Sequence, residues 1–309
     1  MTTPRPVPKE AVLIVNTRSR SGQKLLEEAA TKLEAAGVRL IAKHSIRKPS
    51  ADLVPTMKAA VRDGAPMVIV GGGDGSLSCT VDEVVDRDCV FALLPLGTAN
   101  SFARTLGIPL DLDGAIRTIA TGKRRRIDVG AIGDDFFVNG SAIGLSPMIA
   151  CTIPHKLKRY LGRPGYLIWS IWCLARFKSF KLTVEGPDGA ETLDALEVRI
   201  LNGSYHGGIK VLDDAPIDDG LVVVEAVSGR GRTTLASNWI RLLLGLPKKE
   251  RQVRRFEARS LRIATEPPLP ISIDGEVLAR TPVTARVAER AIEVVVPSPT
   301  SETKIHVAG

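Results

Sequence analysis

Aromatic residues are scarce in this chain of 309 residues. Phe, Tyr and Trp together make up only 4% of it, whereas surfaces that bind single-stranded nucleic acid use aromatic side chains to stack on the bases. The formal net charge of +8 nevertheless indicates an anionic partner. We therefore expect a membrane surface or a phosphate-bearing molecule as the partner, and no nucleic acid.

Cysteine and histidine are also few, at four residues each. The cysteines lack C-x-x-C spacing and stand among apolar neighbours, so we expect reduced, packed thiols rather than disulfides or zinc ligands. They are Cys79, Cys89, Cys151 and Cys173. The histidines are too scattered along the chain to indicate a metal cluster.

The sequence lacks a hydrophobic run long enough to cross a membrane. Residues 1–12 contain Pro4, Pro6 and Pro8 but no apolar core, which indicates a short flexible lead rather than a signal peptide. An apolar segment at residues 166–175 falls well short of the roughly 20 residues that a membrane-spanning helix needs. We therefore expect a cytoplasmic protein.

The apolar segment at 166–175 carries Trp169 and Trp172 and has lysines and arginines on both sides. Such a segment suits a helix that lies against an anionic membrane or lines a lipid entrance. A helix that packs its tryptophans onto the protein and leaves its basic ends in water is an equally good interpretation. If the helix lies against the membrane, the protein should make peripheral contact with the membrane's inner face. The sequence is also compatible with a homodimer.

Two apolar runs end abruptly in loops that contain glycine. Residues 67–70 run into the first glycine loop, which consists of Gly71, Gly72, Gly73, Asp74, Gly75 and Ser76. Residues 90–94 run into the second glycine loop, residues 95–100. Glycines let backbone N–H groups crowd around an anion, and a helix expected after Ser76 would add its positive end. The pattern therefore predicts a phosphate site.

Polar side chains in these two loops suggest more specific roles. Asp74 beside a phosphate suggests a bridging Mg²⁺, although a glycine-rich turn with one aspartate is also an ordinary turn. Thr98 and Asn100 precede an expected helix. They could cap that helix, contact a nucleotide, or do both.

The first part of the chain alternates strands and helices. Residues 11–15 form an expected strand closed by Asn16, a helical pattern follows, and a second strand (38–42) and helix (50–63) lead to the first glycine loop. This alternation predicts a parallel sheet with helices on both faces. Because ligands bind at the carboxyl ends of such strands, Asn16, Ser45 and the two glycine loops should gather there.

The pattern changes at the basic run of residues 123–126. Beyond it, short apolar strands alternate with turn signals such as Gly133-Asp134 and Pro187-Asp188, which is typical of β-hairpins. We therefore place a domain boundary there and predict a mainly β second domain, a sandwich or a barrel-like pair of sheets. The basic run itself is expected to form a solvated face, with contact to phosphate or lipid as the minor alternative.

Five segments together resemble the diacylglycerol kinase catalytic-domain family, specifically the bacterial lipid kinases that share their fold with sphingosine and ceramide kinases. They are GGGDGS at 71–76, LPLGTANSFAR at 94–104, NGSYHGGIKV at 202–211, DDGL at 218–221 and DGE at 274–276. The resemblance follows the family's order and covers nearly the whole chain. It implies an NAD kinase- or phosphofructokinase-like α/β domain at 1–126, a β-sandwich lipid-substrate domain at 127–296, and a tail, 297–309, that returns to the first domain.

The resemblance implies a set of nucleotide-binding residues. Asn16, Ser45, the first glycine loop, Thr98 and Asn100 would bind ATP. Asp74 would in addition take part in catalysis through Mg²⁺. The matches at Asn16 and Ser45 are looser than those in the glycine loops.

The resemblance also gives roles to two acidic turns in the second domain. Asp219 and the backbone carbonyls of Pro216 and Leu221 would hold a structural Mg²⁺, where the residues alone favour a solvated turn. The DGE segment is by itself an ordinary hairpin turn. In enzymes similar to this one it supplies the proton acceptor, for which Asp274 is our first choice and Glu276 the second.

We predict an ATP-dependent lipid kinase with Mg²⁺ as cofactor. It would transfer the γ-phosphoryl group to a hydroxyl of a membrane lipid such as diacylglycerol, in a cleft between the two domains. One alternative is a soluble-metabolite kinase of the NAD kinase type. Another is a catalytically silent lipid-binding or regulatory relative, which Ser101 in place of a common aspartate would favour. The sequence does not identify the lipid.

Overall fold

The structure is a computed structural model that describes residues 5–18, 22–206, 208–212, 216–229, 231, 233, 234, 237, 241 and 253–298. The chain divides into two compact units. Unit 1 contains the described residues up to Ile127 together with those from Arg290 onward, and unit 2 is Asp128–Glu289. The boundaries expected from the sequence lie at residues 126 and 296. Residues 299–309 of the expected tail lie outside the described residues.

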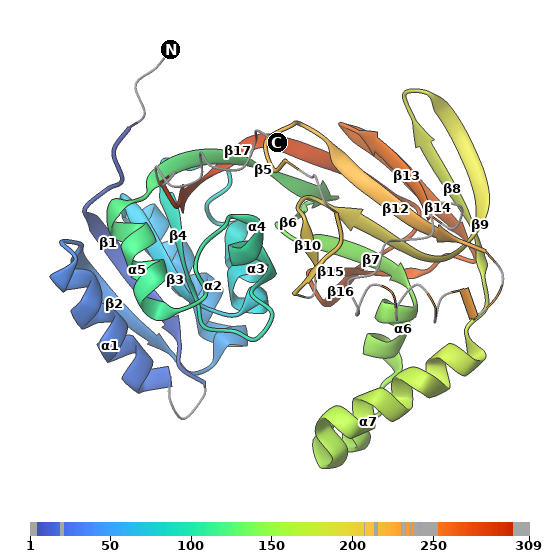
Figure 1. Ribbon diagram of the computed structural model, residues 1–309, viewed down its shortest axis with the longest axis horizontal. Coiled ribbons are helices and arrows are strands. Elements are labelled where there is room, and N and C mark those ends of the chain that lie inside the picture. Colours follow the sequence, from blue (N-terminus) through green and yellow to red (C-terminus); the bar gives the residue numbers. More distant parts are fainter. Residues whose placement is uncertain are drawn as a thin grey trace, which may run out of the picture. The chain divides into compact units, whose positions relative to one another are not determined.

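A parallel sheet forms the centre of unit 1 (Figure 1). Its strands lie in the order β2-β1-β3-β4, and each neighbouring pair is parallel. They are β1 (Glu10–Asn16), β2 (Arg39–Ile46), β3 (Met67–Gly72) and β4 (Val90–Pro95). β3 and β4 are buried along their whole length. Strands covered on both faces have continuous apolar sequences rather than alternating ones.

Helices cover both faces of this sheet, as predicted from the alternating pattern. The helices described in unit 1 are α1 (Gly22–Ala35), α2 (Pro49–Arg62), α3 (Asp74–Val81), α4 (Ser101–Thr105) and α5 (Leu112–Thr121). α1 packs beside α5 on one face, and α2 beside α3 on the other (Figure 1). The predicted α/β architecture of the first part of the chain is confirmed.

Unit 2 consists mainly of antiparallel strands. They are β5 (Lys123–Ile132), β6 (Asp135–Phe137), β7 (Gly140–Gly144), β8 (Phe180–Gly186), β9 (Gly189–Leu201), β10 (Tyr205–His206), β11 (Ile209–Lys210), β12 (Val222–Ser228), β13 (Val253–Ala258), β14 (Ser260–Glu266), β15 (Pro270–Ile273), β16 (Glu276–Arg280) and β17 (Val283–Val296). The hairpins expected at Gly133-Asp134 and Pro187-Asp188 are β5–β6 and β8–β9. The predicted mainly β second half is confirmed.

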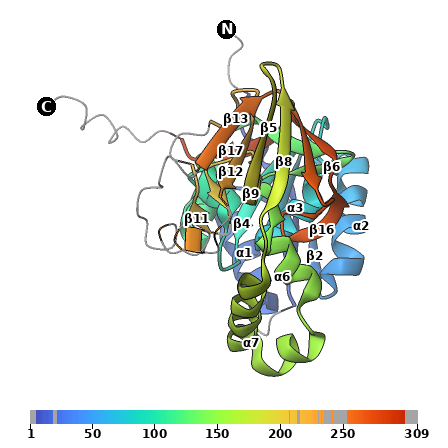
Figure 2. The same ribbon diagram turned by 90° about the vertical axis from the view of Figure 1, so that its right-hand side faces the viewer.

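The strands β5 and β17 each contribute residues to both units. The first part of β17, residues 283–286, pairs with β14 in unit 2, and Glu293 and Val294 pair with β4 in unit 1. Within unit 2 the strand order is β16-β15-β7-β9-β8-β14-β17, and β12 pairs with β9 and β13. Two helices, α6 (Leu145–Thr152) and α7 (His155–Arg176), lie at one end of these strands (Figures 1 and 2).

The basic run at residues 123–126 does not form a solvated face throughout. It is the start of β5, and the Arg124 side chain is only 11% exposed. Its guanidinium pairs with the carboxylate of Glu293, which is 12% exposed. A partner far along the chain on β17 therefore allows one of these charges to be buried.

Candidate active site

The two glycine loops pack against each other backbone to backbone. Each begins in the last residues of one of two adjacent parallel strands, β3 and β4, where Gly72 and Pro95 are register partners. Leu96 N donates to the carbonyl of Gly72 at 2.9 Å. A Cβ atom on Gly97 would lie 2.4 Å from the Cα of Gly73, a distance that no side chain can occupy. Glycine is therefore required at this contact for a steric reason.

The first glycine loop leads directly into α3. This helix begins at Asp74, three residues earlier than expected, because Gly73 is its N-cap and the Gly73 carbonyl accepts bonds from Ser76 N and Leu77 N at 2.9 and 3.1 Å. The first N–H groups of a helix have no partner within the helix and carry its positive partial charge. The end of β3 thus presents donors suited to an anion such as phosphate.

Asn16 at the end of β1 holds the first glycine loop in place. Its Nδ2 donates to Ser76 Oγ at 2.9 Å, and its Oδ1 accepts from Arg18 N at 3.2 Å. A Cβ on Gly72 would lie 2.6 Å from the Cβ of Ser76. Asn16, Gly72 and Ser76 are therefore brought together as expected from the strand ends.

Ser45 at the end of β2 bonds to a different set of residues. Its hydroxyl lies 2.8 Å from Thr17 Oγ1 and donates to Gln23 Oε1 at 2.9 Å. Thr17 directly follows Asn16, and Gln23 belongs to the first turn of α1. Neither Thr17 nor Gln23 was predicted from the sequence. Thr17 could have been found, because it directly follows the strand that ends at the expected ligand-binding edge of the sheet.

Asp74 connects the first glycine loop to the start of α4. Its Oδ1 accepts a hydrogen bond from Phe102 N at 3.2 Å. Among the described residues, its Oδ2 has no hydrogen-bond partner, and the side chain is half-buried. Asp74 therefore combines a local structural bond with a second carboxylate oxygen that could bind a cation.

Asn100 shapes the second glycine loop. The residue has a left-handed backbone with φ of 48° and is 3% exposed. Its Oδ1 accepts from Gly97 N, and its Nδ2 donates to Gly97 O, both at 3.0 Å. The Asn100 side chain makes no capping bond to α4. Thr98, in the same loop, is exposed to solvent.

A hollow of about 340 Å³ lies beside these loops. Its lining residues are Asn16, Arg18, Leu25, Gly72, Gly73 and Leu96. It therefore joins the end of β1, the first glycine loop and the second glycine loop in one concave surface. Arg18 adds a positive charge to it, and the sequence analysis missed this residue because surface arginines are common.

The two acidic side chains of the DGE turn in unit 2 differ in their hydrogen bonds and exposure. Asp274, at φ of 43°, accepts three backbone N–H bonds: Val138 N at 3.1 Å, Asn139 N at 3.3 Å and Gly140 N at 3.0 Å. Its own N–H donates to Gly140 O at 3.0 Å. The Glu276 side chain is exposed and, among the described residues, makes no hydrogen bond or ion pair.

The acidic turn at 216–221 packs against a carboxylate of β5, that of Asp128, which the sequence analysis missed. Asp219 Oδ1 accepts from Leu221 N at 3.0 Å, and the buried Asp128 accepts from Gly220 N at 2.8 Å. Although Asp219 is exposed, partial burial of its carboxyl raises its pKa, the Leu221 N–H lowers it, and the charge of Asp128 raises it further.

The donor set of this turn is compatible with Mg²⁺, which prefers oxygen ligands. Two neighbouring carboxylates repel each other, and a bound cation would remove that cost. No group of three or more histidine, cysteine or acidic side chains that could hold a metal occurs among the described residues. A cation here would therefore depend on backbone carbonyls such as those of Pro216 and Leu221. Residues 213–215 of the acidic turn lie outside the described residues.

Comparison with known proteins agrees with this arrangement. The model of the diacylglycerol kinase catalytic domain matches residues 10–132, and that of the YegS C-terminal NAD kinase beta sandwich-like domain matches residues 143–296. A protein of Enterobacter sp. (strain 638) named "Probable lipid kinase YegS-like" is 33% identical over 228 residues, 72% of this chain and 75% of the relative. The chain belongs to the diacylglycerol kinase catalytic-domain family.

Other members of the family match almost end to end. A diacylglycerol kinase of Staphylococcus aureus (strain bovine RF122 / ET3-1) is 28% identical over 295 residues, 94% of this chain and 93% of the relative. The solved structure of a diacylglycerol kinase from Bacillus anthracis str. Sterne has a TM-score of 0.72 at 21% identity and covers 93% of this chain and 97% of its own. A second structure from that organism reaches 0.77 at 23% identity, with 96% and 98% covered. These structures confirm the fold.

Membership of the diacylglycerol kinase family implies use of ATP and a lipid substrate. In the described part of the chain, none of the helices is long and apolar enough to cross a membrane.

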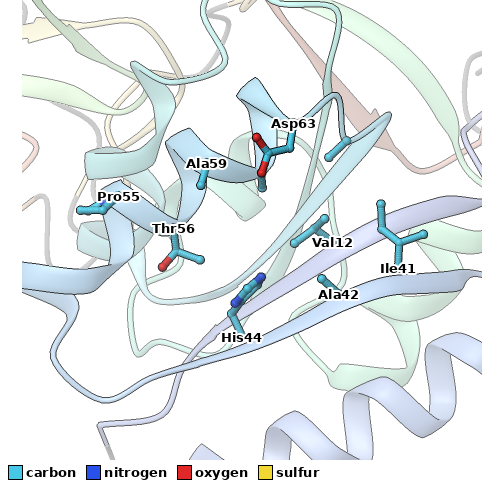
Figure 3. A pocket seen from close by; sticks show the side chains of 10 residues that line it. Val12, Ile41, Ala42, His44, Pro55, Thr56, Ala59 and Asp63 are labelled. Atoms are coloured by element: carbon cyan, nitrogen blue, oxygen red, sulfur yellow. The ribbon is translucent and has the colours of Figure 1, made fainter.

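A second hollow of about 470 Å³ lies between β2 and α2 (Figure 3). Small and apolar side chains, with His44, Thr56 and Asp63, line it. Because it includes no residue of either glycine loop, we do not assign the nucleotide to it.

Proposed function

We propose that this kinase family member transfers the γ-phosphoryl group of ATP to a hydroxyl of a membrane lipid such as diacylglycerol. The observation that carries the proposal is the pair of glycine loops. They pack without side chains at Gly73 and Gly97 and border a hollow that Arg18 helps to line, and the first of them leads into the positive start of α3. Such a surface favours the phosphates of a nucleotide.

The residues around the first glycine loop would hold the nucleotide phosphates. The N–H groups at the start of α3 would bind phosphate oxygens, and Asn16 would keep Ser76 in position through its 2.9 Å bond. Asp74 would hold Mg²⁺ through Oδ2, and the ion would neutralise charge on the phosphates during transfer. Ser101 is 1% exposed and offers no carboxylate, so Asp74 is our choice for this role. Thr98 and Ser45 would contact the nucleotide from the rim.

Glu276 rather than Asp274 would accept the proton of the lipid hydroxyl. Both oxygens of Asp274 already accept backbone N–H bonds, so both are engaged in holding the turn. Glu276 has no such partner among the described residues and stands two positions further along the same turn. We therefore assign Asp274 to positioning of the turn and Glu276 to general base catalysis.

Phosphate transfer to a panel of acceptors tests the proposed function. Purified protein with labelled ATP and Mg²⁺ should label diacylglycerol or another hydroxyl-bearing lipid, and should leave NAD unlabelled. Labelling of NAD alone would instead indicate a soluble-metabolite kinase of the NAD kinase type. Binding of lipid vesicles without consumption of ATP would indicate a catalytically silent relative.

The acidic turn leads to a separate prediction about Mg²⁺ and pH. We propose that Asp219, with the carbonyls of Pro216 and Leu221, binds a structural Mg²⁺. A raised carboxyl pKa means that the folded state binds the proton more tightly, so this group favours folding at low pH and loses that contribution as the pH rises through its folded pKa. Mg²⁺ should therefore raise the Tm at pH 7.5, where it offsets the repulsion, and should have little effect near pH 4, where protons compete.

Differential scanning calorimetry without nucleotide can measure this effect. The variant Asp219→Asn should lose the response to Mg²⁺ and should be at least as stable as the wild type in metal-free buffer, because it lacks the disfavoured charge. Asp188→Asn, on an exposed hairpin turn, is the control and should respond as the wild type does. An unchanged Mg²⁺ response in Asp219→Asn would contradict the metal assignment.

A further inference from the structure

Helix α7 exposes a row of large apolar side chains. Ile168 is 57% exposed, Ile171 60% and Trp172 41%. Their spacing places them on one side of the helix. Exposed single apolar residues are common, but a contiguous exposed apolar face indicates an interaction surface.

The opposite side of α7 is already bound to the core of unit 2. Cys173 is fully buried in that core, and Trp169 and Leu174 pack against it. Trp169 Nε1 also donates to Thr152 Oγ1 of α6 at 3.1 Å. The helix is therefore anchored by one face, so the exposed face cannot be explained by packing onto the protein. The two interpretations offered by the sequence apply to different faces of the same helix.

Trp172 sits between an aromatic and a cationic neighbour. Its ring stacks on that of Trp169 with centroids 4.4 Å apart, and the Arg176 guanidinium lies 4.1 Å from its ring centroid. Tryptophan with a neighbouring cation is typical of residues at the boundary between lipid headgroups and acyl chains. Cation–π contact also keeps the charge of Arg176 beside the apolar row.

Charge decides which partner suits this face. The sequence contains no acidic residue between Asp135 and Glu185. The basic residues in this interval are Lys156, Lys158, Arg159, Arg163, Arg176, Lys178 and Lys181. A second copy of α7 would bring like charges together, whereas an anionic lipid surface would be attracted by the net positive charge of this segment.

We propose that the exposed face of α7, formed by Ile168, Ile171 and Trp172 with Arg176, inserts into the interface of an anionic lipid bilayer. The helix would lie in the plane of the membrane, since no described helix is suited to span it. The inference rests on the proposed function, because a lipid kinase must reach an acceptor that resides in a bilayer. It adds the surface that makes this contact.

Vesicle flotation without nucleotide tests the proposal directly. Wild-type protein should bind vesicles of phosphatidylcholine with phosphatidylglycerol, and should bind pure phosphatidylcholine vesicles or vesicles in high salt much more weakly. The double variant Ile168→Ser/Ile171→Ser should bind the mixed vesicles at least about tenfold more weakly, because two isoleucines no longer leave water. Ile41→Ser, at a position 46% exposed on β2, is the matched control and should bind as the wild type does.

Further measurements separate the possible outcomes. Brominated lipids should quench tryptophan fluorescence of the wild type, which tests insertion even if the double variant fails to fold. A correctly folded double variant should retain activity toward short-chain diacylglycerol in solution and lose it toward vesicles. Wild type that binds anionic vesicles through α7 but phosphorylates no lipid would disprove the proposed function and leave this inference intact. If the double variant bound vesicles as tightly as the wild type, or lost only its self-association in sedimentation, the proposed membrane contact of α7 would be wrong.

Discussion

Replacing Glu276 by Gln is expected to lower kcat by about 10²- to 10⁴-fold, the range of a general base, without a change in Tm. The side chain is exposed and has no polar partner among the described residues. The substitution therefore removes no stabilising contact of the Glu276 side chain with the described residues. Steady-state kinetics with a lipid acceptor, together with calorimetry, measure both quantities.

Asp274→Asn provides the contrast within the same turn. It should lower the free energy of unfolding by about 1 to 3 kcal/mol, because a neutral amide replaces a carboxylate that accepts bonds from Val138 N, Asn139 N and Gly140 N. Activity should fall as well, since the turn that carries Glu276 loses its anchor. Full activity in Glu276→Gln, combined with loss of activity at unchanged Tm in Asp274→Asn, would return the proton acceptor role to Asp274.

Asp74→Asn is expected to reduce activity by at least about 100-fold while the fold stays intact. The asparagine Oδ1 can still accept the bond from Phe102 N that Asp74 accepts at 3.2 Å. What it loses is the negative charge that we propose binds Mg²⁺. Asp74→Ala should lose both the charge and the bond, and its Tm should therefore be lower than that of Asp74→Asn.

Kinetics at varied Mg²⁺ and calorimetry distinguish the two roles of Asp74. Asp52→Asn, on the exposed surface of α2, is a control that should change neither activity nor the Mg²⁺ dependence. If Asp74→Asn were as active as the wild type and only Asp74→Ala were impaired, Asp74 would be a structural residue. The Mg²⁺ proposal for the glycine loops would then be wrong.

Local patterns were sufficient to predict the main elements of the fold. Continuous apolar runs at 67–70 and 90–94 indicated strands covered on both faces, and β3 and β4 are buried along their whole length. Gly133-Asp134 and Pro187-Asp188 indicated hairpins because tight turns depend on neighbouring residues alone. The start of α3 was misjudged by three residues, since the sequence placed it after Ser76, whereas Gly73 is the N-cap and Asp74 the first helical residue.

Interactions between residues distant along the chain could not be predicted in this way. From the sequence, Asp274 was our first choice as proton acceptor and Glu276 the second, because the sequence could not show that residues 138–140 bring three N–H groups to Asp274. Asp128 stands far from Asp219 in the chain, and its influence on the pKa of Asp219 depends on their proximity. Arg124 reads as part of a solvated run until Glu293 is placed beside it.

The sequence by itself determined the α/β and β halves, the two glycine loops and the turns in which candidate carboxylates stand. These features follow from periodicity and backbone preferences that act over a few residues. Only the tertiary structure decided that Asp274 is bound by backbone donors, that Gly73 and Gly97 touch, and that one face of α7 remains exposed. Each of these depends on which distant backbone or side chain occupies the neighbouring space, and that is set by packing rather than by local pattern.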